Sequence, residues 1–174
     1  TLAHMNQVNT QQLERMKKLN MYLALHPWGV INSGNMHELF GDRAYEMPPL
    51  RLIQDSGIMW GFGTDATAAN QYMPFVTLGY AVSGKLGGIK VINGTISREY
   101  ALIAHTRRNA FFIFQEDNLG AIQPGKLADL VVLDRDYLSV PVDQIKDIKP
   151  VMTMLGGRIV YEADAPVTTT RAAR

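Results

Sequence analysis

The stretch from residue 58 to residue 67 restricts the fold of this chain more than any other. Large apolar residues alternate with glycines from Ile58 to Gly63, and the run then stops at a single acid, Asp65. This pattern predicts a buried strand. In parallel α/β proteins the functional side chains lie at the carboxyl ends of the strands. The sequence therefore predicts an α/β fold with Asp65 as a functional carboxylate at the edge of a parallel sheet.

Two histidines occupy similar positions upstream. His4 and His26 each close a short apolar run. The intervals between His4, His26 and Asp65 average roughly 30 residues, which is about one strand–helix unit of a (β/α)8 barrel. Histidine and aspartate side chains gathered at one edge are zinc-type ligands. Our working hypothesis is a metal-dependent hydrolase site, of which this chain contains a part.

Simpler interpretations exist for each of these residues. An aspartate after a strand is often a helix N-cap or a turn former, so Asp65 could cap a following helix. A histidine at a strand end is often only a polar terminus, and this alternative stays open for His26. His37 lacks the second histidine of an H-E-x-x-H motif, because Gly41 stands there, and it is dismissed as a zinc ligand of that type. His105 is expected to be a partly exposed helix residue.

The composition excludes several classes of function. The chain has no cysteine, which excludes disulfides, thiolate zinc sites and cysteine nucleophiles and leaves His, Asp and Glu as ligands. Seventeen basic and sixteen acidic residues give a nearly neutral chain, so neither nucleic acid nor membrane is an expected partner. We expect a cytoplasmic protein. Because Thr1 is no initiator and residues 2–4 resemble the end of a strand, we also expect the chain to be the carboxyl-terminal part of something longer.

The first two thirds of the chain read as helices alternating with buried strands. Thr10 is the predicted N-cap of a helix through Leu19, and a buried strand is expected at residues 21–25. A long loop is predicted over residues 28–46. Further helices are expected over residues 50–55, 73–83 and 97–114, of which the first is opened by two prolines and ended by Gly57, and the last is capped by Ser97.

The pattern changes near Asp117, beyond which short strands and turns dominate. Strands are predicted at residues 120–122, 130–133, 151–155 and 158–161, with the last two joined at a Gly-Gly pair that indicates a hairpin. The predicted organisation is thus an α/β part over residues 1–116, a β subdomain over 117–163 and a disordered tail over 164–174.

The segment of residues 120–126 matches the spacing of a Walker A loop. Leu127 stands where the Mg²⁺-binding Ser or Thr would be, however, and Pro124 removes an amide from the phosphate cradle. A strand is also predicted to follow, where a helix N-terminus would be needed. We interpret the segment as a tight turn.

The same region carries a resemblance to a known family. Residues 119–134, LGAIQPGKLADLVVLD, resemble the "G-s-I-x-x-G-K-x-A-D-L-v-v-l-D" segment of the amidohydrolase superfamily. Residues 99–110 are similar to that family's "eeAL…T…A" helix, residues 151–161 to its closing "v-x-x-t-m-v-x-G-r-v-v-y", and residues 63–66 to its "G-S-D-A-P". Residues 43–57 look closest to the branch that includes N-substituted formamide deformylase.

The resemblance implies the last units of a distorted (β/α)8 barrel plus part of a small β-sandwich, with one or two divalent metals, usually zinc. Asp65 would match the acid after the eighth strand, which binds metal and takes the proton of the attacking water. His4 would match the histidine after the sixth strand, a ligand of the second metal. His26 would follow the seventh strand, where this branch commonly has Gln-Pro, and we expect it to contact substrate. Thr67 replaces a proline or valine, a minor departure.

Other residues implied by the resemblance would precede Thr1: an H-x-H pair, a bridging lysine or acid, and a fifth-strand histidine. His4 and Asp65 alone fall short of the three protein ligands typical of catalytic zinc. We therefore expect hydrolysis of a C–N bond in a small-molecule amide or cyclic amide by the complete protein, and an inactive isolated chain. Self-association, or association with the missing amino-terminal part, is expected as well. The alternative is a non-catalytic or degenerate module of the same fold.

Overall fold

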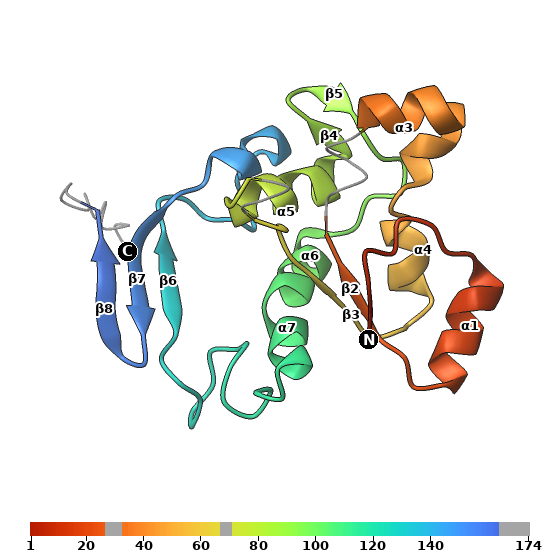
Figure 1. Ribbon diagram of the computed structural model, residues 1–174. Helices are drawn as coiled ribbons and strands as arrows, with labels where there is room; N and C mark the ends of the chain where they lie inside the picture. Colours follow the sequence, from red (N-terminus) through yellow and green to blue (C-terminus); the bar gives the residue numbers. More distant parts are fainter. Residues whose placement is uncertain (27–32, 67–70, 164–174) are drawn as a thin grey trace.

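Three parallel strands lie at the centre of the computed structural model, which describes residues 1–26, 33–66 and 71–163 and has a mixed α/β fold (Figure 1). The strands are β1 (Leu2–Ala3), β2 (Leu23–Leu25) and β3 (Trp60–Phe62), in the spatial order β1-β2-β3. Ala24 of β2 pairs with Ala3 on one side and with Gly61 on the other. The predicted parallel pairing of three strands, ending near His4, His26 and Asp65, is therefore confirmed.

Helices α1 (Thr10–Lys18) and α4 (Leu50–Asp55) lie in the two connections between these strands. Leu13 and Met16 of α1 are buried, as their helical spacing predicts. The N-cap is Asn9 instead of the predicted Thr10, because Asn9 and Gln12 form a reciprocal capping box. Helix α4 follows the two prolines as predicted, with Ser56 as its C-cap and Gly57 next in the left-handed conformation.

The prediction of a loop over residues 28–46 is wrong over its described part. Residues from Ser33 form helix α3 (Ser33–Phe40), which continues into the 3-10 helix η1 (Gly41–Glu46). Gly34 lies inside the helix, where a glycine costs only about 1 kcal/mol. Gly41, at φ 57°, marks the change from one helix to the other. The glycines that suggested a loop are thus tolerated within helical structure.

Helix α5 (Pro74–Ser83) confirms the prediction for residues 73–83, and Gly84 ends it in the left-handed conformation. The following turn is a small antiparallel hairpin of β4 (Lys85–Leu86) and β5 (Ile89–Lys90). The helix expected from Ser97 to Phe114 is capped by Ser97 but divides into α6 (Arg98–His105) and α7 (Arg107–Phe112). It breaks at Thr106, whose hydroxyl donates to the carbonyl of Leu102. Both helices contact β3.

Three antiparallel strands follow as a separate sheet, with α5, α6 and α7 between it and the parallel one (Figure 1). They are β6 (Leu130–Leu133), β7 (Pro150–Leu155) and β8 (Arg158–Glu162), and the hairpin at Gly156–Gly157 is confirmed. The strand predicted at residues 120–122 is wrong. Gly120 there has φ 84° and lies so close to Arg107 that a Cβ would be 2.8 Å from its Cα. The segment is a turn that packs on α7, in agreement with the rejection of a nucleotide-binding loop.

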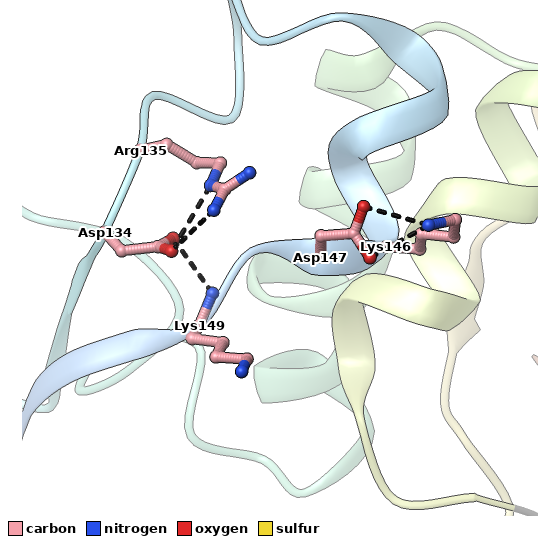
Figure 2. A network of polar contacts seen from close by, with 5 residues as sticks. All are labelled: Asp134, Arg135, Lys146, Asp147 and Lys149. Atoms are coloured by element: carbon pink, nitrogen blue, oxygen red, sulfur yellow. Dashed lines mark hydrogen bonds and ion pairs between the residues drawn. The ribbon is translucent and has the colours of Figure 1, made fainter.

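The connection from β6 to β7 contains the 3-10 helix η2 (Val142–Asp147), which the sequence did not suggest. It packs against α5. Polar contacts fix the chain on either side of it (Figure 2). Asp134, just after β6, accepts from the Lys149 amide at 3.0 Å and pairs with Arg135, while Lys146 pairs with Asp147. The predicted tail over residues 164–174 lies outside the described residues. No helix in the described ranges is long and apolar enough to cross a membrane.

Candidate metal centre

The side chains of His4, His26 and Asp65 meet at the carboxyl ends of the three parallel strands. His4 directly follows β1, His26 directly follows β2, and Asp65 lies three residues beyond β3. The rings of His4 and His26 meet edge to face with their centroids 4.1 Å apart. Nδ1 of His26 is 3.5 Å from Oδ2 of Asp65. The sequence-predicted site residues are thus brought together by the register of neighbouring strands.

The backbone turns sharply at two of these positions. His4 has φ 63° and Asp65 has φ 59°, which places both in the left-handed region. Residues other than glycine adopt this conformation uncommonly, although Asp and His do so more often than most. Its cost is of order 1–3 kcal/mol, and such residues cluster at functional sites. The tertiary structure thus holds His4 and Asp65 in a backbone conformation that these residues do not adopt readily by themselves.

The three side chains differ in their exposure to solvent. His26 is 7% exposed, whereas the Asp65 side chain is 31% exposed and His4 is open to solvent. Burial lowers the pKa of His26, and the neighbouring His4 lowers it further, while the carboxylate of Asp65 acts in the opposite direction. The net lowering of this pKa favours the neutral form of His26. The more exposed His4 and Asp65 are the groups accessible to a ligand.

Two glycines of the central run have different roles. A Cβ built on Gly61 would be 2.3 Å from Oδ1 of Asn109 and 2.6 Å from the ring of Phe112. Gly61 is thus required for the close approach of α7 to β3. A Cβ on Gly63 would meet no atom of the described residues within 4 Å. The space beside Gly63, two residues before Asp65, is thus open as far as residues 1–26, 33–66 and 71–163 are concerned.

Asn109 is a residue of this region that the sequence did not single out. Its Nδ2 donates to the carbonyl of Phe62 at 2.9 Å and to that of His105 at 3.2 Å. This contact ties α7 to the carboxyl end of β3, the strand that leads to Asp65. An amide within a predicted helix gives no signal in the sequence, because only the tertiary structure shows which carbonyl it reaches.

The remaining candidates lie in other settings. Asp65 is not the N-cap of the next described helix, because that position in α5 is held by Met73. His37 packs edge to face on Tyr45 with ring centroids 4.1 Å apart. His105 is half-buried on α6, and burial lowers its pKa.

The donor set at the sheet edge suits a divalent metal in type but not in number. Imidazole and carboxylate are zinc ligands, and His4 and Asp65 supply one of each beside open space. Within residues 1–26, 33–66 and 71–163, however, no group of three His, Asp or Glu side chains is arranged to hold a metal ion. His4 and Asp65 can thus form part of a metal site.

A mixed α/β fold with histidine and aspartate at the carboxyl edge of a parallel sheet suits a metal-dependent hydrolase. The sequence profile of the Amidohydrolase family matches residues 1–161. The chain therefore belongs to the amidohydrolase family, as the motifs at residues 119–134 and 151–161 indicated.

Relatives agree with this assignment. N-substituted formamide deformylase of Arthrobacter pascens is 25% identical over 168 residues, which cover 92% of this chain and 30% of that protein. A solved structure of an uncharacterized metal-dependent hydrolase from Pyrococcus furiosus is 28% identical with a TM-score of 0.65, over 79% of this chain and 28% of that one. Atrazine chlorohydrolase from Arthrobacter aurescens, solved with zinc, shares the fold with a TM-score of 0.68 at 20% identity, over 96% of this chain and 37% of that one. The chain thus spans about a third of the length of these proteins.

Proposed function

We propose that the chain is the carboxyl-terminal part of a metal-dependent amidohydrolase that hydrolyses a C–N bond in an amide or cyclic amide. The observation that carries the proposal is the placement of His4 and Asp65 on either side of His26 at the carboxyl edge of the parallel sheet, both on left-handed backbone. Membership of the amidohydrolase family supports it, as does similarity to a formamide deformylase.

In this proposal β1, β2 and β3 are the sixth, seventh and eighth strands of a (β/α)8 barrel. Residues 1–116 form the barrel portion, and residues 117–163 form part of a β-sandwich. The parallel order β1-β2-β3 supports the first assignment, and the antiparallel sheet β6-β7-β8 supports the second.

His4 and Asp65 would hold the metal, which in this proposal is zinc. When bound, zinc supplies Lewis acidity and lowers the pKa of water to about 7. Asp65 accepts the proton of the attacking water, because its carboxylate is partly exposed at the end of β3 and the adjoining space at Gly63 is open. His26 lies beside them, and the small exposed part of its ring can contact the amide substrate.

Two ligands on this chain leave the site one short of the three that a catalytic zinc needs. The remaining ligands would come from the part of the protein outside this chain, which spans 30% of the deformylase. The isolated chain would accordingly be inactive, and that missing part would be its natural partner.

A second candidate function is a non-catalytic module of the amidohydrolase fold. It is favoured by the lack of a three-residue metal group among the described residues. The two proposals differ in what they predict for Asp65 in the whole protein. A catalytic Asp65 is essential, whereas in a non-catalytic module it is an ordinary strand terminus.

The test is turnover of N-substituted formamides and other simple amides by the whole protein carrying Asp65→Asn. The change keeps the shape and an oxygen ligand but removes the proton acceptor, so the rate should fall by about 10²–10⁴. His4→Ala should lower the metal content measured by elemental analysis. His37→Ala is the matched control, since His37 packs on Tyr45 and should leave turnover and metal unchanged. A folded, metal-loaded Asp65→Asn protein with near wild-type turnover would refute the proposal.

A further inference from the structure

We propose that His26 is a positioning residue that holds the carboxylate of Asp65 by donating a hydrogen bond from Nδ1 to Oδ2. One oxygen of Asp65 is then fixed by the protein, which would orient the carboxylate for the role proposed above. The inference rests on the proposed function of Asp65.

The contact follows directly from the strand register. Leu25 of β2 is paired with Phe62 of β3, so the residues that follow these two strands emerge side by side. His26 is the first residue after β2, and the chain reaches Asp65 after Gly63, whose amide donates to the carbonyl of Leu25 at 3.0 Å. The resulting Nδ1–Oδ2 distance is 3.5 Å. That distance exceeds the usual 2.7–3.2 Å of an N–H···O bond, and such contacts often tighten when a site is loaded.

The His26 ring is largely enclosed. It is 7% exposed, and the His4 ring packs against it at an interplanar angle of 70°. A neutral imidazole carries one proton and has one acceptor nitrogen. The nitrogen beside a carboxylate is the one on which a proton is stabilised, so Nδ1 is the donor.

The arrangement also separates His26 from the metal ligands. A carboxylate that binds a metal is itself commonly hydrogen-bonded by a partner outside the coordination sphere, and loss of that partner weakens metal binding by about 10–100-fold. His26 meets Asp65 through a hydrogen-bonding atom, Nδ1, which lies 3.5 Å from Oδ2. His26 is thus placed to hydrogen-bond Asp65, the proposed metal ligand.

The direct test is the position of the proton on His26, read from a two-bond ¹H–¹⁵N correlation spectrum of the labelled 174-residue chain without metal. We expect the proton on Nδ1 in the wild type and a shift of the tautomer toward Nε2–H in Asp65→Ala. His37 is the internal control and should give the same spectrum in both proteins. A wild-type His26 with its proton on Nε2, or a His26 spectrum that Asp65→Ala leaves unchanged, would overturn the proposal.

A second measurement titrates the metal-free whole protein with zinc alone. His26→Leu should weaken binding by about 10–100-fold. His26→Asn should stay within a few-fold of the wild type, because the Asn amide nitrogen can take the place of Nδ1. Equal affinities for the wild type and His26→Leu would refute the positioning role. A wild type without zinc binding would count against the proposed function instead, and the proton position would still decide the contact between His26 and Asp65.

Discussion

Replacement of Gly61 by alanine tests the packing that carries the candidate site. An added Cβ would be 2.3 Å from Oδ1 of Asn109 and 2.6 Å from a ring carbon of Phe112, both on α7. Either α7 moves away from β3 or the side chains leave their positions. Overpacking of this kind costs about 1–3 kcal/mol. Displacement of Asn109 also removes its hydrogen bond to the carbonyl of Phe62, worth about 0.5–1.5 kcal/mol.

Gly63→Ala is the matched control, two residues along the same chain segment. A Cβ there meets no described residue within 4 Å, and Gly63 is not among the residues with positive φ. The same substitution should therefore be neutral or stabilising by about 0.4–1 kcal/mol, through the unfolded state. The assay is urea unfolding of both variants and the wild type, followed by circular dichroism. If Gly61→Ala proves as stable as Gly63→Ala, the close approach of α7 to β3 is wrong.

Two further outcomes follow from the structure. Burial lowers the pKa of His105, whose Nε2 has no hydrogen-bond partner among the described residues, so the unfolded chain binds a proton there before the folded chain does. The free energy of unfolding should fall as the pH drops from about 7.5 to about 5, and this pH dependence should be weaker in His105→Gln. Urea unfolding of both proteins across this pH range measures it, and the same pH dependence in His105→Gln as in the wild type would contradict the prediction. The sheet β6-β7-β8 exposes apolar side chains such as Val131, Ile159 and Val160. Analytical ultracentrifugation should therefore detect self-association of the chain at high concentration, and Ile159→Lys should reduce it. A chain that stays monomeric at high concentration would contradict this prediction.

The parts of the fold that could be predicted from the sequence are those governed by local pattern. The strand before Asp65, the helix at residues 73–83 and the hairpin at Gly156–Gly157 each have a clear periodicity or turn signal. The boundaries that failed depend on competing contacts. Asn9 is the N-cap in place of Thr10, because its capping box with Gln12 satisfies two backbone donors at once. The helix that begins after Ser97 breaks at Thr106, whose side chain bonds to the carbonyl of Leu102.

The candidate site was predictable in its residue types but not in its contacts. His4, His26 and Asp65 each end a short apolar run, and parallel pairing was enough to bring them to one edge. The contact between His26 and Asp65 depends on the register of β2 and β3, which the sequence does not reveal. The left-handed backbone at His4 and Asp65 is equally invisible in sequence, because neither position is a glycine.

The central claim is that His4 and Asp65 bind a divalent metal at the carboxyl edge of the parallel sheet. The most direct measurement is a titration of the ¹⁵N-labelled chain with Co²⁺, a paramagnetic ion that accepts the same nitrogen and oxygen ligands as zinc. Because paramagnetic broadening reports even weak binding, it needs neither a substrate nor a complete ligand set. We expect broadening centred on residues 4, 26 and 65 that disappears in the His4→Ala, Asp65→Ala double variant. Broadening elsewhere, or broadening at this edge that survives in the double variant, would contradict it.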